Sequence, residues 1–285
     1  MLSILIPVYR WDVRPLVRAL YAQARATGEA FELLVYDDAS GDATAAQLRE
    51  LGKPAEVRVK VMPENVGRAR LRNRLATDAR GDWLLFMDAD AGVPPTDFLA
   101  NYLSARNGAD VLCGGTAYAP TPPADPAYYL RWHYGRRREQ RSARVRAAAP
   151  YASFSTFNFM IRRTIFAQIR FDERLRTYGH EDTIFGWQLA QRKIPIAHLD
   201  NPLLHLGIDN NKVFMRKCQR SISNLKLLKQ YYPTFDTRLL RAHRRLAWAL
   251  PVFRSLEKTI HTHLLGPAPQ LHLFDLWKLL QLNRQ

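Results

Sequence analysis

The chain has 285 residues, of which 47% are hydrophobic, and its formal net charge is +16. This length suits one globular domain with a small appendage. Its two cysteines, Cys113 and Cys218, are too few for a disulfide framework or a four-ligand zinc site, and they favour a reducing compartment. No run approaches the roughly 20 apolar residues of a membrane span. The apolar start Met1–Tyr9 also lacks the basic segment and cleavage site of a signal peptide.

The positive charge is concentrated in two segments. Residues 131–146 hold seven Arg and one Glu, and residues 210–285 hold fourteen Lys and Arg against three acids. The rest of the chain is therefore close to neutral. Such asymmetry predicts an anionic partner, which is a phosphorylated substrate, an anionic lipid surface or a nucleic acid.

Short apolar runs alternate with helical patterns in the first 90 residues. Strands are predicted at Leu2–Val8, Phe31–Tyr36, Val57–Met62 and Asp82–Met87. Helices are predicted between them, the last over Arg68–Ala79. Strands that are apolar on both faces and alternate with helices predict an α/β fold with a mostly parallel sheet flanked by helices. Ligands bind beyond the carboxyl ends of such strands, where Asp37-Asp38 and Asp88/Asp90 fall.

The pattern changes at residues 119–126, where four prolines exclude a regular element. Beyond them we expect a strand over Ser153–Arg162, a helix over Asp182–Arg192 and a strand over Ile194–Leu199. From residue 210 the sequence predicts helices, the first from about Lys212 to Tyr231.

Asp88-Ala89-Asp90 directly follows the apolar run Trp83–Met87. Mg²⁺ and Mn²⁺ are hard ions that prefer carboxylate oxygens. Two carboxylates at a strand end can have separate roles. One can face a nucleotide, and the other can bind a metal ion that holds the diphosphate of that nucleotide. An Asp-x-Asp motif alone is a weak signal, because chance and helix capping also produce it. Its position after a buried strand favours the functional interpretation.

Five ordered motifs resemble those of the family 2 glycosyltransferases, which have the GT-A (Rossmann-like) fold. The motifs are Ser3–Tyr9, Val35–Ser40, Asn65–Asn73, Leu84–Asp90 and Gly179–Asp182. The resemblance covers residues 1 to about 210, and the order and spacing of the motifs make it specific. It implies an inverting transfer from a nucleotide-diphospho-sugar, usually a UDP-sugar, with Mn²⁺ or Mg²⁺.

The resemblance also implies roles for single residues. In the matching motifs, the residues that would bind the nucleotide-sugar are Pro7, Val8, Tyr9, Asp37, Asp38, Gly67, Arg68, Arg72, Asp88, Ala89 and Asp90. Asp90 is the stronger metal ligand of its pair, and Asp88 is shared with the nucleotide. Related enzymes often place a histidine as a third metal ligand where His205 stands. The alternative for His205 is a buried, hydrogen-bonded histidine.

Glu181-Asp182 resembles the acidic pair in which the second acid serves as catalytic base. Inversion requires a base to deprotonate the acceptor hydroxyl as it attacks C1 from the face opposite the diphosphate. A carboxylate at a helix N-terminus stays ionised, and the alternative for Asp182 is a helix cap. For acceptor binding we expect Asn158, Trp132 and His180, although Trp132 suits a core equally well and His180 suits a turn.

We divide the chain into a catalytic domain over residues 1–210, with a nucleotide-sugar part (1–115) and an acceptor part (116–210), and a basic helical region over 211–285. In that region, the arginines of 238–245 lie opposite an apolar stripe, and residues 271–282 add Phe274, Trp277 and six leucines. Such helices suit either an anionic membrane surface or a lid packed on the catalytic domain.

The favoured function is therefore a metal-dependent, hexosyltransferase-type glycosyltransferase. It would build a cell-surface polysaccharide or glycolipid on a glycan or lipid-linked acceptor. We expect it in the cytoplasm or peripherally on the inner face of the cytoplasmic membrane. One alternative is a nucleic-acid-binding protein, suggested by the pI of about 10.2, although no recognised nucleic-acid motif is present. The other is a catalytically inactive sugar-nucleotide-binding protein, against which the presence of every expected acid argues.

Overall fold

The structure is a computed structural model that describes residues 1–175 and 179–284. Within these residues the chain forms two compact units. Unit 1 consists of Met1–Ala117, residues 140–175 and Glu181–Gly207, and unit 2 consists of Tyr118–Glu139, residues 179–180 and residues 208–284. Residues 118–139, which the sequence placed with the acceptor part, thus group with the C-terminal helices.

Unit 1 is built on a seven-stranded sheet with the order β3-β2-β1-β4-β7-β5-β8. The strands are β1 (Leu2–Val8), β2 (Phe31–Asp37), β3 (Val57–Val61), β4 (Trp83–Met87), β5 (Val111–Cys113), β7 (Asn158–Arg162) and β8 (Ile196–His198). Neighbouring strands run parallel, except that β7 runs antiparallel to β4 and to β5. A small second sheet pairs β6 (Thr116–Ala117) with β9 (Leu203–Leu204). The predicted mostly parallel α/β sheet is confirmed.

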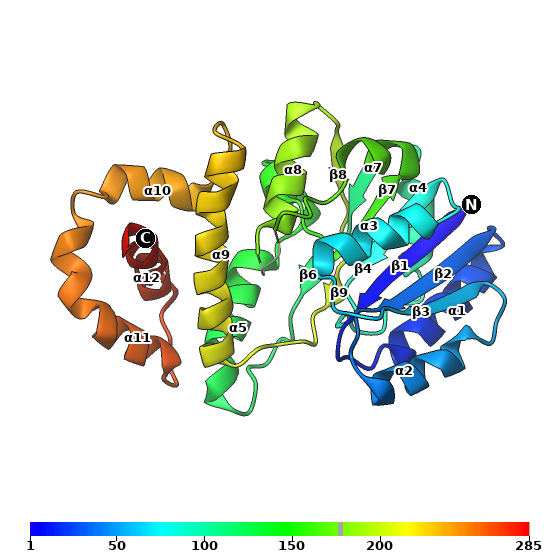
Figure 1. Cartoon of the computed structure of the whole chain (residues 1–285), viewed down its shortest axis with the longest axis horizontal. Helices are drawn as coiled ribbons and strands as arrows, with labels where there is room; N and C mark the ends of the chain where they lie inside the picture. The colour runs from blue at the N-terminus through cyan, green and yellow to red at the C-terminus, as the bar shows by residue number, and fades with distance from the viewer. Residues whose placement is uncertain (176–178, 285) are drawn as a thin grey trace. The chain divides into compact units, whose positions relative to one another are not determined.

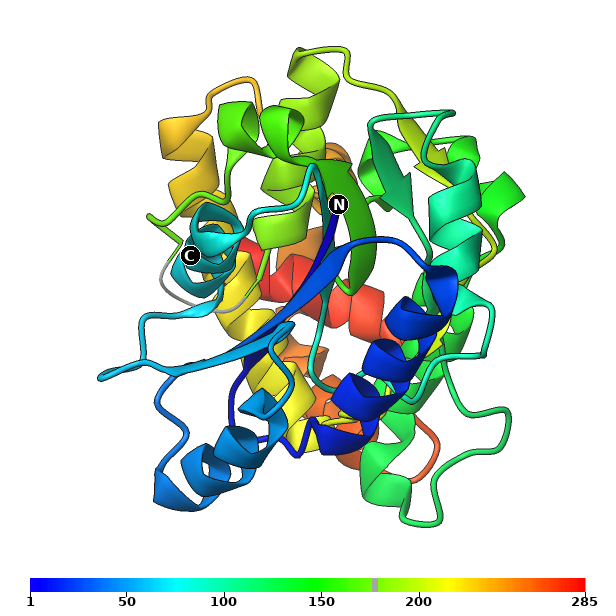
Figure 2. The same cartoon turned by 90° about the vertical axis from the view of Figure 1, so that its right-hand side faces the viewer.

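Helices cover both faces of this sheet. They are α1 (Arg14–Thr27), α2 (Asp42–Arg49), α3 (Arg68–Asp78), α4 (Phe98–Ala105), α6 (Ala143–Ala147), α7 (Arg163–Ile169) and α8 (Glu181–Gln191). Figures 1 and 2 show α1 and α2 on one side of the sheet and α3 on the other. The predicted strand over Ser153–Arg162 begins only at Asn158. The segment before it turns, because the Phe157 amide donates to Ser155 Oγ (3.3 Å).

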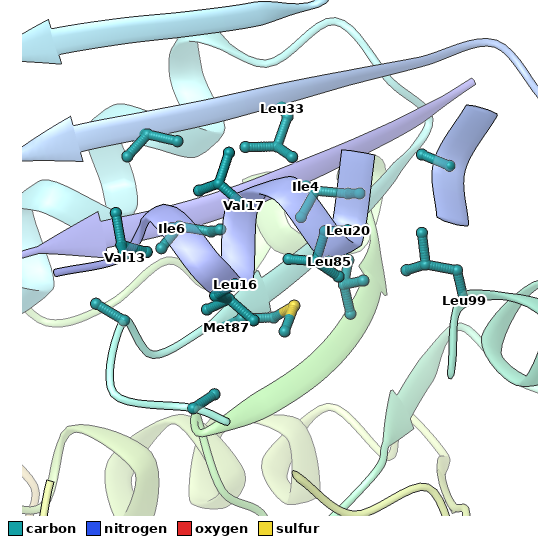
Figure 3. Close-up of a cluster of buried hydrophobic side chains, with 14 of the residues drawn as sticks. Ile4, Ile6, Val13, Leu16, Val17, Leu20, Leu33, Leu85, Met87 and Leu99 are labelled. Atoms are coloured by element: carbon teal, nitrogen blue, oxygen red, sulfur yellow. The ribbon is translucent and has the colours of Figure 1, made fainter. Parts of the chain in front are cut away.

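Alternate residues of β1 face opposite layers, as the two-residue period of a strand requires. Ile4 and Ile6 pack against Leu16 and Leu20 of α1 in a cluster that includes Met87 of β4 (Figure 3). All five side chains are fully buried or nearly so. Burying such a side chain contributes about 1.5–3 kcal/mol, so this face holds the ends of β1 and β4 in place.

An aromatic cluster fills the opposite face and anchors α8. The rings of Phe86 and Phe159 stack with centroids 4.9 Å apart. Phe185 of α8 lies 4.7 Å from Phe171 and 5.1 Å from Phe154, also measured between ring centroids. Because Phe185 is fully buried, this ring fixes the position of the helix that begins with Glu181.

We expect Phe185→Ala to destabilise the protein by about 3–5 kcal/mol, the usual cost of removing a buried phenylalanine ring. Urea unfolding followed by circular dichroism measures this change. Val145→Ala, at a residue that is 46% exposed, is the control and should shift stability by less than about 0.5 kcal/mol. Equal stabilities of the two variants would contradict the anchoring role.

Unit 2 is helical, as the sequence predicted from residue 210. Its elements are η2 (Pro126–Tyr128), α5 (Tyr129–Tyr134), the short π-helix η3 (Gly135–Glu139), α9 (Asn211–Tyr231), α10 (Arg238–Leu246), the 3₁₀ helix η5 (Leu250–Leu256), α11 (Glu257–Leu265) and α12 (Leu271–Arg284). Figure 1 shows α12 surrounded by α9, α10 and α11. Phe274, Trp277 and Leu280 of α12 are buried in the core of this unit. These three side chains of α12 are therefore not available to a lipid surface.

Within residues 1–175 and 179–284, the structure contains no helix with the length and apolar character of a membrane span.

Candidate active site

Several chain segments meet at one edge of the sheet of unit 1. β1, β2 and β4 run parallel, so Tyr9, Asp38 and Asp88 follow their carboxyl ends at the same edge. The antiparallel strand β7 begins there, because Asn158 pairs with Met87. The sheet therefore collects the predicted residues where open α/β sheets bind their ligands.

Asp38 joins the end of β2 to the turn before α3. Its Oδ1 accepts a hydrogen bond from the Val66 amide (2.7 Å), and its Oδ2 accepts one from the Gly67 amide (3.0 Å). Burial raises the pKa of Asp38, and these two amides partly offset the rise. The carboxylate thus positions the turn, and a contact with a nucleobase would use its remaining lone pairs.

Three of the predicted nucleotide-binding side chains point into the protein. Val8 and Ala89 belong to the core on the α1 face, and Asp37 is fully buried. The Asp37 carboxylate accepts hydrogen bonds from the hydroxyl and the amide of Ser40 (3.0 Å for the amide). The Ser40 hydroxyl in turn accepts one from the Arg10 amide (2.7 Å). These three side chains shape the strand ends, so a ligand at this edge would meet the backbone of Val8, Asp37 and Ala89 more readily than their side chains.

Other predicted residues are more accessible at this edge. Pro7 is half-buried, and the ring of Tyr9 is exposed. Gly67 precedes α3 with φ of 85°, in the left-handed region that favours glycine. Arg68 is the first residue of α3, and a helix N-terminus attracts anions. The turn at Gly67 also lines a cavity of about 300 Å³, whose charged lining residues are Glu64, Arg70 and Glu173.

Arg72 of α3 reaches Asp88. The Arg72 guanidinium is buried, donates from Nη2 to Asp88 Oδ1 and lies 5.6 Å from the Phe171 ring centroid. The neighbouring Asn73 side chain donates to the Phe171 carbonyl and accepts from its amide, both at 2.9 Å. The Arg-Asn pair therefore holds Asp88 on one side and the segment around Phe171 on the other.

Asp90 and His205 form a pair just beyond β4. His205 Nε2 lies 3.3 Å from Asp90 Oδ2, and Ala91 and His205 form an antiparallel bridge. Burial by itself would raise the pKa of Asp90, but the hydrogen bond and charge of His205 and the charge of Arg68 hold it below its ordinary value. Asp90 is therefore an ionised carboxylate at neutral pH.

The three predicted metal ligands are only partly assembled. Asp90 and His205 are neighbours, whereas Asp88 faces Arg72. In the part of the chain that the structure describes, no three His, Cys, Asp or Glu side chains converge as a metal-binding group. An ionised carboxylate beside an imidazole still fits the donor preference of Mn²⁺, and Mg²⁺ sites commonly combine one or two carboxylates with phosphate oxygens. The residues thus fit a divalent ion that is shared with a diphosphate.

Gly207 packs against the Asp90 carboxylate and restricts its position. A Cβ added at Gly207 would lie 2.2 Å from Asp90 Oδ2 and 2.9 Å from Asp90 Cγ. We expect Gly207→Ala to displace the carboxylate and to lower about 100-fold the metal-dependent hydrolysis of a nucleotide-sugar donor that is proposed below, because misplacement by about 1 Å has effects of that size. Gly52→Ala is the control, since its Cβ meets Val59 only at 3.5 Å. Hydrolysis at the wild-type rate in Gly207→Ala would contradict this packing role.

Asn158, predicted to bind the acceptor, is instead a buried structural residue. It is 1% exposed. Its Nδ2 donates to the Gly115 carbonyl (2.8 Å), and its Oδ1 accepts from the Tyr102 hydroxyl. A weaker bond of 3.3 Å reaches the Asn201 carbonyl. Because the amide is used within the protein, Asn158 positions the segments that follow β5 and β8.

Glu181 and Asp182 occupy the first turn of α8 and are half-buried. The Asp182 Oδ1 accepts a hydrogen bond from the Thr183 amide (2.7 Å). Because Asp182 lies inside the helix, it is not the N-cap residue, which was its alternative role. Residues 192–195 connect α8 directly to β8, so α8 runs antiparallel to that strand and begins toward the carboxyl edge of the sheet. Asp182 is thus on the side of the sheet where Asp88 and Asp90 lie.

The other two predicted acceptor residues belong to unit 2. Trp132 of α5 is half-buried, and its indole Nε1 donates to the Ala119 carbonyl (2.9 Å). His180 has φ of 72°, and burial lowers its pKa to about 4, so its ring is neutral at pH 7. The preceding Gly179 touches Ser221 of α9 so closely that a Cβ would lie 2.5 Å from the Ser221 side chain. Gly179 and α9, both in unit 2, are therefore in close contact.

Arg146 is a structural residue that the sequence did not reveal. It is buried, and its guanidinium donates to the carbonyls of Cys113 (3.0 Å), Gly114 (3.1 Å) and Leu199 (2.6 Å). These partners lie 32 to 53 positions away, so no local pattern separates Arg146 from the other arginines. Arg131 is also buried and pairs with Glu139 (3.0 Å). Part of the predicted anion-binding charge is thus used inside the fold.

Known proteins share parts of this sequence and this fold. The chain is 31% identical over 114 residues to the uncharacterized glycosyltransferase YfnE of Bacillus subtilis (strain 168), a match that covers 39% of this chain and 29% of YfnE. The chain thus spans less than a third of that curated relative.

Two solved structures are similar in fold. The mannosyltransferase PcManGT from Pyrobaculum calidifontis, solved in complex with GDP-Man and Mn²⁺, has a TM-score of 0.61 at 16% identity, with 99% of this chain and 84% of PcManGT covered. Residues 1–349 of S. aureus TarS give a TM-score of 0.53 at 16% identity, with 99% and 89% covered. At these identities the likeness supports the GT-A fold. The model of glycosyl transferase family 2 matches residues 3–170, from β1 through α7. This chain therefore belongs to glycosyl transferase family 2.

Proposed function

We propose that the protein transfers a sugar, with inversion, from a nucleotide-diphospho-sugar to a hydroxyl of a glycan or lipid-linked acceptor in cell-surface glycan synthesis. The observation that carries this proposal is the arrangement of Asp88 and Asp90 beyond β4. Asp88 is held by the buried Arg72, and the ionised Asp90 is held beside His205. Two carboxylates fixed in different surroundings can serve the nucleotide and a divalent ion separately.

The donor end of the site is built by the chain itself. Asp38 fixes the turn that ends at Gly67, and the start of α3 with Arg68 provides a positive region for the diphosphate. PcManGT was solved with GDP-Man and Mn²⁺, and TarS with UDP and with UDP-GlcNAc. These ligands support a nucleotide-sugar donor here, and we expect a UDP-sugar.

Asp90 and His205, with Asp88 through the nucleotide, are the residues that would hold Mn²⁺ or Mg²⁺. When bound, such an ion neutralises the charge that develops on the diphosphate as it leaves. The chain's own contribution is to keep Asp90 ionised and fixed in position. His205 and Gly207 do this from a segment more than 100 residues away in sequence.

Asp182 is the proposed base. It lies in the first turn of α8, whose N-terminal dipole favours an ionised carboxylate, and Phe185 anchors the same helix in the aromatic core. Asp182 would accept the proton of the acceptor hydroxyl as that oxygen attacks the anomeric carbon. Glu181 beside it would bind or orient the acceptor.

A panel of nucleotide-sugars with and without Mn²⁺ tests the function. Without an acceptor, a glycosyltransferase can slowly transfer the sugar of its donor to water. We therefore expect one donor to release UDP, and to do so only when the metal is present. The matched negative control is Asp90→Ala. Binding of duplex DNA with a steep salt dependence, together with no hydrolysis of any donor, would instead support the nucleic-acid alternative.

A further inference from the structure

Unit 2 exposes a short run of large apolar side chains between α10 and α11. In residues 246–256, the most exposed are Trp248 at 82% and Val252 at 75%. Leu246, Phe253 and Leu256 are also exposed, whereas Leu250 alone anchors the segment in the core. The core of unit 2 is already filled by α12, so the exposed residues of this segment serve no packing purpose that the structure shows.

The same region carries unbalanced positive charge. Residues 238–270 contain six Lys or Arg and one acid, Glu257, which is buried and accepts a hydrogen bond from Gln281 (2.7 Å). Arg241 and Arg244 pair with Asp236. Arg245, Arg254 and Lys258 are exposed, and across the described residues they form no ion pair. Exposed apolar residues of this segment thus alternate along the chain with exposed cations.

We propose that the 246–256 segment is the element by which this protein docks on an anionic lipid bilayer. Trp248 and Val252 would enter the boundary between headgroups and acyl chains, where an indole finds both an apolar and a hydrated environment. Arg245, Arg254 and Lys258 would contact the anionic headgroups, each cation adding to the attraction. The proposal concerns a surface of unit 2 and does not depend on the chemistry at Asp90 or Asp182.

The combination of positive charge and exposed apolar side chains favours a bilayer over other partners. Exposed apolar patches with polar rims mark interaction surfaces, and here the rim is cationic. The apolar residues come from one continuous chain segment, which lets them enter a fluid interface together as monotopic segments do. An acidic protein is the competing partner for this segment. Failure of the wild type to bind anionic vesicles in the experiment below would favour that partner.

Sedimentation with vesicles tests the proposal on the full chain. We expect binding to phosphatidylcholine vesicles that contain about 30% phosphatidylglycerol, and little binding to pure phosphatidylcholine, because the attraction requires surface charge. The double variant W248E/V252E should bind at least tenfold more weakly. V145E is the matched control, since Val145 is 46% exposed in unit 1 beside other arginines, and it should bind as the wild type does.

A second measurement tests whether Trp248 enters the bilayer. Vesicles with brominated acyl chains should quench part of the fluorescence of the wild type, and this quenching should be lost in W248F while binding is retained. Absence of vesicle binding by the wild type, or equal binding by W248E/V252E, would overturn the proposal. Equal weakening by V145E and W248E/V252E would overturn it as well. Hydrolysis of a soluble donor should be unchanged in W248E/V252E, so this test fails or succeeds independently of the proposed sugar transfer.

Discussion

Asp182→Asn is expected to reduce sugar transfer by about 10²–10⁴-fold, the usual contribution of a positioned general base. The amide has nearly the same shape as the carboxylate and can still accept the Thr183 hydrogen bond, so α8 should remain folded. It cannot take a proton from an acceptor hydroxyl. Transfer is measured as product formed from the donor identified in the panel, with a simple glycan acceptor.

The same variant should bind the nucleotide and Mn²⁺ with the wild-type affinity in a calorimetric titration, because Asp182 lies on α8 and not at the strand end that holds Asp90. Glu181→Gln is the matched comparison and should lose less activity, since the adjacent acid remains. Wild-type transfer by Asp182→Asn would remove Asp182 as the base and leave the nucleotide site untouched.

Asp90→Ala is expected to abolish both transfer and metal-dependent binding of the nucleotide. A bound divalent ion supplies several kcal/mol of charge stabilisation, and each 1.36 kcal/mol is a factor of ten, so a loss of about 10³-fold or more follows. The substitution also removes the partner of His205 at 3.3 Å. Titration of the nucleotide with and without Mn²⁺ separates the two effects.

Asp82→Ala provides the control for Asp90→Ala. Asp82 lies just before β4, at the opposite edge of the sheet, and its side chain is 69% exposed. We expect this variant to retain nucleotide binding and transfer. If Asp90→Ala bound the nucleotide with the same metal dependence as the wild type, Asp90 would not be a metal ligand. Equal loss of nucleotide binding in Asp90→Ala and Asp182→Asn would contradict their separate roles.

The structure shows that some of the basic residues counted in the composition are buried or paired within the protein. Arg131 and Arg146 are buried and satisfied inside the fold, and Arg138 pairs with Asp275 (2.9 Å). Arg245, Arg254 and Lys258, next to the 246–256 segment, are among the exposed cations that remain. A count of charges therefore predicts that an anionic partner exists but not which surface meets it.

Much of the fold was predictable from the sequence because its signals are local. The periods of the apolar residues identified β1 to β4 and α1, and the acids that follow β2 and β4 fell at strand ends because parallel strands end at one edge. The start of β7 was misjudged, since a local hydrogen bond from Phe157 to Ser155 bends a segment whose composition suits a strand.

The tertiary structure decided which side chains are available to a ligand. Asn158, Asp37 and Val8 stand in the motifs of a binding site, yet all three side chains are buried. Those of Asn158 and Asp37 also form hydrogen bonds within the protein.

The sequence by itself determined the α/β class, the family motifs and the acids at the strand ends, because periodicity and motif order depend on near neighbours. Only the tertiary structure decided that His205 and Gly207 hold Asp90, and that α12 is core while Trp248 is exposed. Those outcomes depend on contacts between residues far apart in the chain, and spacing along one segment does not specify them.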